Sequence, residues 1–193
     1  MAAIGYDVDP VSSRSHLRDL LAAHCACDAD ERDHYTRMLE LLDVPGDPFT
    51  RVHFEPGHFT ASAFVLAPDG GALLLIEHPK LGRWLQPGGH VEADDADVLA
   101  AARREIAEEV GLRDLPLVVD GVFDLDVHRI PALGSEPPHE HFDLRFAFRA
   151  PDRRLRVGHD TEAKIARWFS LSEIEAGASD HSVLRAARKL AKR

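Results

Sequence analysis

The segment that most restricts the fold of this chain is a glycine-containing loop followed by an acidic helix. Ala, Arg and Glu dominate Val98 to Val110, which predicts a helix, and Gly111 marks its end. Glu105, Glu108 and Glu109 are spaced i, i+3 and i+4, so they project from one helix face. Apolar residues elsewhere on the same segment supply packing groups. The chain is therefore expected to hold an acidic helix face against a packed domain.

Two interpretations of the acidic face are open from the helix alone. Three close carboxylates repel one another, and a bound Mg²⁺ or Mn²⁺ removes that cost because these cations prefer oxygen ligands. Alternatively, the face is solvated and balanced by Arg103 and Arg104. The upstream segment Pro87-Gly88-Gly89-His90-Val91-Glu92 favours the metal, because glycines let the backbone approach a ligand closely. A metal site is predicted, with the three glutamates and the Gly89 carbonyl as ligands.

The remaining patterns predict a mixed sheet packed by helices. Two helical stretches occupy the first fifty residues, the first capped by Ser12 or Ser13, the second opened by a capping box of Asp28 and Glu31. A hairpin, further strands and two late helices follow, with Ser170 or Ser172 capping the first of these. The expected strands are Ala61 to Ala67, Ala72 to Ile76, Val122 to Ile130, His141 to Phe148 and Ile165 to Phe169, and the last helix covers Ser182 to Lys192.

Composition and charge limit the class of protein. The chain has 193 residues, 45% of them hydrophobic, which suits one packed domain with an accessory segment. A formal net charge of −10 disfavours long nucleic acid as a partner but allows a small phosphorylated substrate. No apolar stretch approaches the ~20 residues of a membrane span, and Met1 to Pro10 lacks a signal pattern. Cys25 and Cys27 fit neither a zinc site nor a disulfide framework, so a cytoplasmic protein is expected.

The loop and helix together resemble the signature of the Nudix hydrolases. That signature runs glycine, five residues, glutamate, seven residues, then Arg-Glu-aliphatic-any-Glu-Glu-any-Gly-aliphatic. Arg104 to Leu112 matches every position of the second half, and Gly89 matches the opening glycine. The resemblance covers roughly Phe59 to Leu190. It implies an α+β or α/β Nudix fold, with a mixed sheet between helices over 57–193 and a helical extension over 1–56.

Two departures from the signature affect the loop. Asp95 stands nearest to the position of the first glutamate, and 14 residues separate Gly89 from Arg104 where the pattern has 13. The extra residue is expected near Asp94 to Asp97. An insertion inside the helix would turn its acidic face by about 100° relative to the loop.

The resemblance also implies a reaction. Nudix hydrolases cleave the diphosphate of a nucleoside diphosphate linked to another group, with Mg²⁺ or Mn²⁺ as cofactor. Arg104 is expected to orient a neighbouring carboxylate such as Glu92 or Glu105. Glu108 ranks first as general base, Glu162 second, and Glu140 is a further candidate. The substrate itself is left open among nucleoside triphosphates, ADP-ribose and other nucleotide sugars, dinucleoside polyphosphates and coenzyme A.

A second group of polar residues suggests substrate binding. His141, Asp143 and Arg145 share one face of their strand. If that face lines the cleft, Arg145 would hold a phosphate in fork geometry; the alternative is an ion pair facing solvent. His139 and His141 invite a metal interpretation, against which stands the lack of a third ligand.

Several alternatives remain at this point. Trp84 and Phe142 would stack a base or pack in the core. The N-terminal helices would cover part of the sheet or mediate a homodimer. A nucleotide-binding module without activity would be favoured by loss of the box glutamates, yet all three are present. Isomerisation of a small diphosphate would need extra acid–base residues, for instance a cysteine in the cleft, but Cys25 and Cys27 lie outside the matched region.

Overall fold

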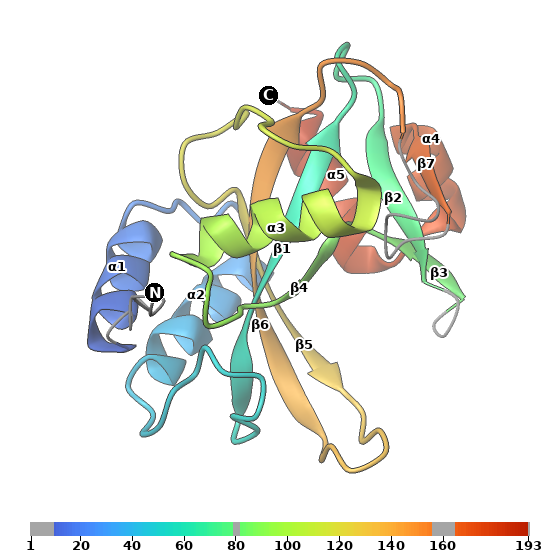
Figure 1. Ribbon diagram of the computed structural model, residues 1–193. Coiled ribbons are helices and arrows are strands. Elements are labelled where there is room, and N and C mark those ends of the chain that lie inside the picture. Colours follow the sequence, from blue (N-terminus) through green and yellow to red (C-terminus); the bar gives the residue numbers. More distant parts are fainter. Residues whose placement is uncertain (1–9, 79–81, 156–164, 193) are drawn as a thin grey trace, which may run out of the picture.

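Strand β1 (Gly57–Leu66) forms the centre of a seven-stranded mixed sheet in the computed structural model, which describes residues 10–78, 82–155 and 165–192. β1 pairs in parallel with β6 (His139–Arg149), and β5 (Asp124–Ile130) follows β6 as an antiparallel edge strand. On its other side, β1 pairs antiparallel with β2 (Leu73–His78) and β4 (Gly88–His90). The short strands β3 (Arg83–Leu85) and β7 (Ala166–Phe169) both pair with β2 (Figure 1).

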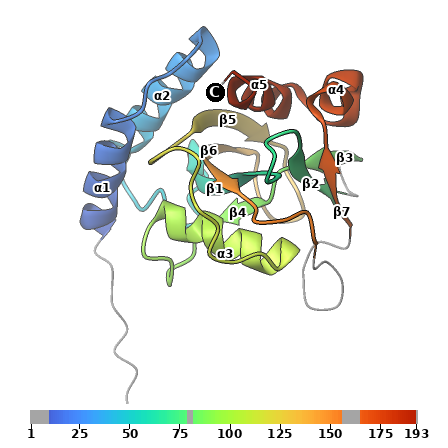
Figure 2. The ribbon, with the colours of Figure 1, turned by 90° about the horizontal axis from the view of Figure 1, so that it is seen from above.

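Helices cover both faces of this curled sheet. Helix α3 (Val98–Val110) packs on one face, and α4 (Leu171–Glu173), the π-helical turn η1 (Ile174–Ala178) and α5 (His181–Leu190) lie over the other (Figure 2). The expected mixed sheet between helices is confirmed. Within the described ranges, no helix has the length and apolar character that crossing a membrane requires.

The N-terminal helices α1 (Pro10–Ala22) and α2 (Ala29–Leu41) share the core of the sheet. Leu17 and Leu21 of α1 and Met38 and Leu41 of α2 are at most 1% exposed and belong to the apolar cluster that lies between the sheet and α3. The expectation that these helices cover part of the sheet is therefore confirmed.

The pairing of β1 with β6 sorts side chains by polarity. Side chains alternate along a strand, and His58, Thr60 and Ser62 of β1 are paired with His141, Asp143 and Arg145 of β6. Opposite these, β5 contributes Asp124, Asp126 and His128. The prediction that His141, Asp143 and Arg145 share one face is confirmed. The intervening apolar residues, such as Phe59 and Phe142, join the core on the α3 side.

Local signals predicted some element ends correctly and others not. The bounds of α3 are as expected, with Asp97 as N-cap and Gly111 in the left-handed conformation (φ 68°) as C-cap. The predicted Ser12 or Ser13 cap is wrong, because α1 already begins at Pro10. Asp28 caps α2, but the Glu31 carboxylate accepts from the Cys27 amide instead of completing a box. Ser170 caps α4 in a full capping box.

Candidate active site

The loop and helix of the Nudix-like signature meet as the spacing predicted. Helix α3 packs on β1 and β4, which brings its acidic face against the Gly88-Gly89 backbone. The Gly88 amide donates to Glu109 Oε2 at 2.9 Å. Glu105 is 9% exposed, whereas the Glu108 side chain is 44% exposed. The acidic face thus carries a largely buried carboxylate at Glu105 and a carboxylate at Glu108 that solvent reaches.

The Arg104 guanidinium is hydrogen-bonded to several groups of this site. Its Nη1 donates to Glu105 Oε1 and to Glu108 Oε2, both at 2.9 Å, and its Nη2 donates to the His90 carbonyl at 2.8 Å. Burial alone would lower the pKa of Arg104, but the surrounding carboxylates outweigh it and raise that pKa. The geometry agrees with the expected positioning role towards Glu105. Glu92 is more distant, at 3.9 Å, and is not hydrogen-bonded to Arg104.

Asp95 fixes the loop that precedes α3 by hydrogen bonds to both the loop and the helix. Arg104 donates to it from Nε at 3.1 Å and from Nη2 at 3.0 Å, and Asp95 Oδ2 accepts from the Glu92 amide at 2.9 Å. The Asp95 side chain is 6% exposed. Helix α3 runs without a break from Val98 to Val110, so its glutamates keep one register. The placement of the extra residue near Asp94 to Asp97 stays a prediction.

Gly89 provides a backbone surface directly against Glu105. A Cβ at this position would lie 2.3 Å from Glu105 Oε1 and 2.7 Å from its carboxyl carbon, so a side chain would fill the space that the carboxylate uses. Three carboxylates beside a closely approached backbone are a hard oxygen donor set. These residues therefore fit a divalent cation such as Mg²⁺ or Mn²⁺.

Arg145 does not match either interpretation made from the sequence. It is 1% exposed, so the solvent-facing ion pair is wrong. All three of its side-chain nitrogens contact protein groups: Nε donates to Asp143 at 2.8 Å, Nη2 lies 3.1 Å from Asp126, and Nη1 lies 3.4 Å from Asp124. The guanidinium nitrogens of Arg145 are therefore already paired with protein carboxylates, which contradicts the predicted role of Arg145 in holding a phosphate. The reason is the place of Arg145 under α5, where Ser182 Oγ accepts from it at 3.0 Å.

The aromatic candidates for base stacking differ in placement. Phe142 is 1% exposed and lies in the core, so the stacking interpretation is wrong for it. Trp84 is half-buried and packs on Phe169, with ring centroids 4.9 Å apart. Its part in substrate binding stays a prediction.

The candidate general bases lie in different parts of the molecule. Glu108 is on the acidic face of α3, and its carboxylate is held by Arg104. Glu140 is ion-paired with Arg37 of α2 at the start of β6. Glu162 lies outside the described residues. Of the two candidates among the described residues, Glu108 is thus the one that lies beside the other signature residues.

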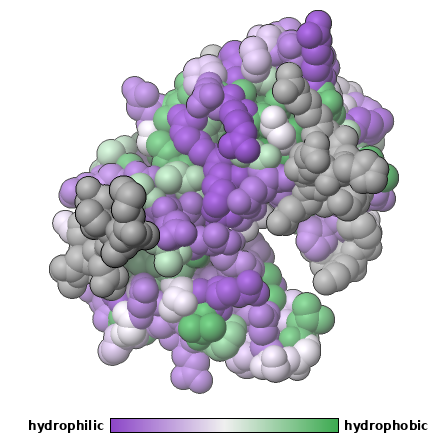
Figure 3. All heavy atoms as spheres, viewed as in Figure 1, coloured by the Kyte–Doolittle hydropathy of each residue, from purple (hydrophilic) through white to green (hydrophobic). Residues whose placement is uncertain are grey.

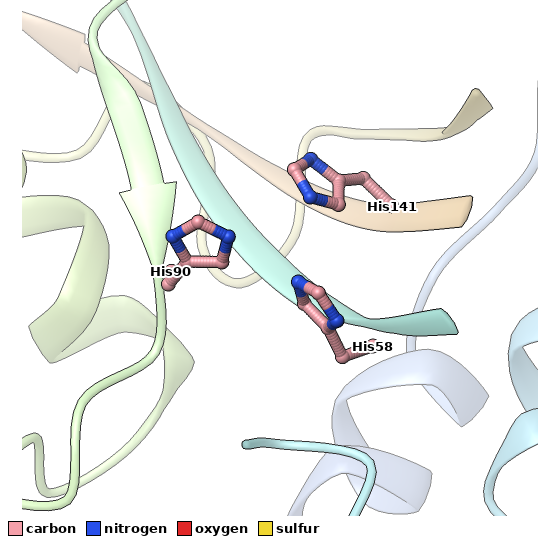
Figure 4. Close-up of side chains that lie close together, drawn as sticks. All are labelled: His58, His90 and His141. Atoms are coloured by element: carbon pink, nitrogen blue, oxygen red, sulfur yellow. The ribbon is translucent and has the colours of Figure 1, made fainter. Parts of the chain in front are cut away.

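Sequence reasoning missed two histidines near His141. His58 of β1, His90 of β4 and His141 of β6 bring one ring nitrogen each within 4.8 Å of one another (Figure 4). The polar His58 next to the apolar Phe59 was a local signal of a strand with one polar face. The sequence did not show that His58 lies opposite His141, because the parallel pairing of β1 with β6 joins residues 83 positions apart. In the space-filling view, hydrophilic side chains gather in a band across the middle of the face on which α3 lies (Figure 3).

Fold, signature and acidic site together define the class of this protein. A family model described as NUDIX domain matches residues 56–187, and the chain belongs to that family of pyrophosphohydrolases. Among curated relatives, "Phosphatase NudJ" of Escherichia coli O1:K1 / APEC is 34% identical over 125 residues, which cover 63% of this chain and 72% of that protein. The matched family region begins after α2.

Solved structures share the fold at lower identity. The Ap4A hydrolase of C. elegans, in a binary complex, is 21% identical with a TM-score of 0.51, covering 69% of this chain and 95% of that one. The dihydroneopterin triphosphate pyrophosphohydrolase of E. coli is 18% identical with a TM-score of 0.53, covering 72% and 96%. These likenesses support the Nudix fold of the sheet and its helices.

Proposed function

We propose that this protein is a divalent-metal-dependent hydrolase that cleaves a phosphoanhydride bond of a nucleoside diphosphate linked to another group. The observation that carries the proposal is the pairing of Arg104 with Glu105 and Glu108, directly against the Gly88-Gly89 backbone. A solvated acidic helix face would not need a buried carboxylate or a glycine fitted against it. The three similar proteins named above are called a phosphatase, an Ap4A hydrolase and a dihydroneopterin triphosphate pyrophosphohydrolase, and these names agree with hydrolysis of a phosphorylated substrate.

Glu105, Glu108, Glu109 and the Gly89 carbonyl would hold Mg²⁺ or Mn²⁺. When bound, such a cation polarises phosphoryl oxygens and lowers the pKa of a coordinated water. Arg104 fixes the directions of Glu105 and Glu108 through hydrogen bonds of 2.9 Å. Gly88 fixes Glu109 in the same way through its amide. The chain thus arranges the carboxylates before substrate arrives, which reduces the cost of organising charge around a diphosphate.

Glu108 is the proposed general base. It is the more exposed partner of Arg104, and it lies one helical turn from Glu105 on the same face. In the proposed reaction, the oxygen of water bonds to phosphorus and a proton passes to the Glu108 carboxylate. The bond between phosphorus and the bridging oxygen breaks, and the departing phosphate carries the electron pair.

A substrate panel tests the proposal. Release of phosphate or nucleotide is measured with Mg²⁺ or Mn²⁺ for nucleoside triphosphates, ADP-ribose and other nucleotide sugars, dinucleoside polyphosphates, coenzyme A and dihydroneopterin triphosphate. Turnover of one class is expected, and a matched Glu108→Gln variant should lose about 10²–10⁴-fold in kcat if it removes a general base. Binding of panel members without turnover by the wild type would instead indicate a nucleotide-binding module.

A further inference from the structure

Three histidines from three strands converge beside the Nudix signature. His58 and His141 are paired residues on the parallel strands β1 and β6. His90 on β4 is paired with Thr60, two residues along β1 from His58, so all three side chains lie on the same face of the sheet. Figure 4 shows the rings turned toward a common space, and one nitrogen of each lies within 4.8 Å of the others.

The hydrogen bonding of His58 leaves a buried nitrogen with an unused lone pair. Its Nδ1 lies 3.1 Å from the His53 carbonyl, and a carbonyl only accepts, so Nδ1 carries the proton. Nε2 is therefore an acceptor. This atom is buried and has no hydrogen-bond partner among the described residues, in a residue that is 1% exposed. A buried polar atom without a partner is uncommon in folded proteins and needs an explanation.

The surroundings of His58 and His141 favour neutral imidazoles. Burial lowers the pKa of His58 to about 4, and burial also lowers the pKa of His141. His139 adds to the crowding, with its ring stacked on that of His58 at 5.0 Å between centroids. Positive charges on rings packed this closely would repel one another, which favours the neutral form. Neutral imidazole is the form that binds metals.

We propose that His58, His90 and His141 bind a divalent transition-metal ion, best matched by Zn²⁺, with a fourth position left for water or a substrate oxygen. Imidazole nitrogens suit Zn²⁺ and related ions, whereas Mg²⁺ prefers oxygen. Zn–N distances of about 2.0–2.1 Å place tetrahedral ligand atoms about 3.4 Å apart. The three ring nitrogens now lie within 4.8 Å of one another, and small side-chain movements would bring them to that spacing. The hydrogen bond from His58 to the His53 carbonyl is the kind of contact that orients a ligating histidine.

This site is separate from the carboxylate site although the two adjoin. A Cβ on Gly89 would point at Glu105, and the alternation of side chains directs the next residue, His90, to the opposite face of β4. One short strand thus stands between a hard oxygen donor set and a nitrogen donor set. The proposal goes beyond the hydrolase function and does not depend on it.

Zinc titration of the chelator-stripped full chain tests the proposal. Isothermal titration calorimetry is run in excess Mg²⁺, and the absorption spectrum with Co²⁺ reports four-coordinate nitrogen ligation. The wild type should bind one equivalent saturably. His90→Asn and His141→Asn, at half-buried positions, should each weaken binding by more than the about 10–100-fold that loss of a ligand's orienting partner causes. His181→Asn, at an exposed position, is the matched control and should bind as the wild type does.

Three outcomes would overturn the proposal. The first is no saturable Zn²⁺ binding by the folded wild type, and the second is unchanged binding in both His90→Asn and His141→Asn. The third is loss of binding in Cys27→Ser, which would assign the zinc to the second possible ligand group, Cys27, Asp28 and Glu31. Glu109→Gln should keep Zn²⁺ binding while losing hydrolysis, so failure of the zinc site and failure of the hydrolase function are distinguishable.

Discussion

Gly89 is a residue whose missing side chain shapes the active site. In Gly89→Ala, the new Cβ would lie 2.3 Å from Glu105 Oε1, which is the end of a side chain that can move. The fold should therefore survive while the carboxylate shifts. A displacement of about 1 Å near the chemistry can cost about 10²-fold in rate, and a loss of that order in kcat/KM is expected.

The matched control is Gly57→Ala, whose Cβ would lie 1.8 Å from the Glu140 carbonyl oxygen, a backbone atom that cannot yield. That variant should lose stability instead, so its melting temperature should fall while that of Gly89→Ala stays near the wild-type value. Wild-type activity in Gly89→Ala would contradict the proposed role of Glu105.

Arg104 is a positioning residue, and its replacement should act through the glutamates. Lysine keeps the charge but not the planar fork that contacts Asp95, Glu105 and Glu108 at once. Arg104→Lys should lower kcat by about 10–100-fold and raise the Mg²⁺ concentration needed for half-maximal rate. Arg103→Lys is the control, because Arg103 bonds the Leu115 carbonyl and lies over Phe148. An unchanged Mg²⁺ dependence in Arg104→Lys would contradict this role.

At the residue scale, the sequence predicts groups whose partners are near in the chain. The spacing of Glu105, Glu108 and Glu109 and the proximity of Gly89 follow from one loop and one helix. The burial of Arg145 does not, because its partners come from β5 and from Ser182 at the start of α5. For the same reason, His58 was not recognised as a neighbour of His141.

Helix α5 is anchored to the sheet by buried charges. Arg185 Nη1 and Nη2 donate to the two oxygens of Asp124, each at 2.9 Å, and the Asp124 side chain is 0% exposed. Arg185→Met would leave that carboxylate with fewer partners in the interior. Breaking a buried pair typically costs about 3–5 kcal/mol in the free energy of unfolding, and a loss of that order is expected in urea denaturation.

Arg188→Met is the comparison on the same helix. Arg188 pairs with Glu175 at the surface, with side-chain exposures of 54% and 43%, so a loss of at most about 1 kcal/mol is expected. Equal losses in the two variants would contradict the claim that the Asp124 pairing holds α5 in place.

At the element scale, helix ends marked by local caps were predictable. Gly111 ends α3 as expected, and Ser170, one of the two predicted caps, caps α4. Strand neighbours were not predictable, since the parallel pairing of β1 with β6 depends on contacts between distant segments. Alternation predicted which residues of β6 share a face, but not that α5 would cover part of it.

At the scale of the whole molecule, a buried carboxylate joins α2 to α5. Glu31 of α2 is 0% exposed and accepts from His24 at 2.9 Å, from the Cys27 amide, and from Lys189 of α5. Burial would raise the pKa of Glu31, but these hydrogen bonds outweigh it and lower that pKa below its usual range. The N-terminal helices are thereby tied to the last helix.

This pairing predicts an acid-sensitive stability. Because the folded-state pKa of Glu31 is depressed, its contribution is fully present above the unfolded pKa of about 4.3 and is lost as pH falls below it. Melting temperatures measured from pH 7 down to pH 3 should fall more steeply for the wild type than for Glu31→Gln. The variant should already be less stable at pH 7. Parallel curves for the two proteins would contradict a charged, buried Glu31.

At the scale of the whole molecule, the signature predicted the family and the mixed sheet, because loop and helix are specific to that class. The division into an extension over 1–56 and a domain over 57–193 stays a proposal. The core shared by Leu17, Met38 and the sheet shows how closely the N-terminal helices adjoin that domain. The substrate was beyond prediction, since substrate recognition depends on loops whose arrangement the sequence does not give.

The most direct test of the central claim compares Glu109→Gln with Glu175→Gln on whichever panel compound the wild type turns over. Glu109 is on the acidic face of α3 and bonds the Gly88 amide, whereas Glu175 is a surface residue paired with Arg188. With Mg²⁺ or Mn²⁺ varied, Glu109→Gln should lose orders of magnitude in kcat and Glu175→Gln should match the wild type. Wild-type turnover in Glu109→Gln would contradict a metal site on this helix face.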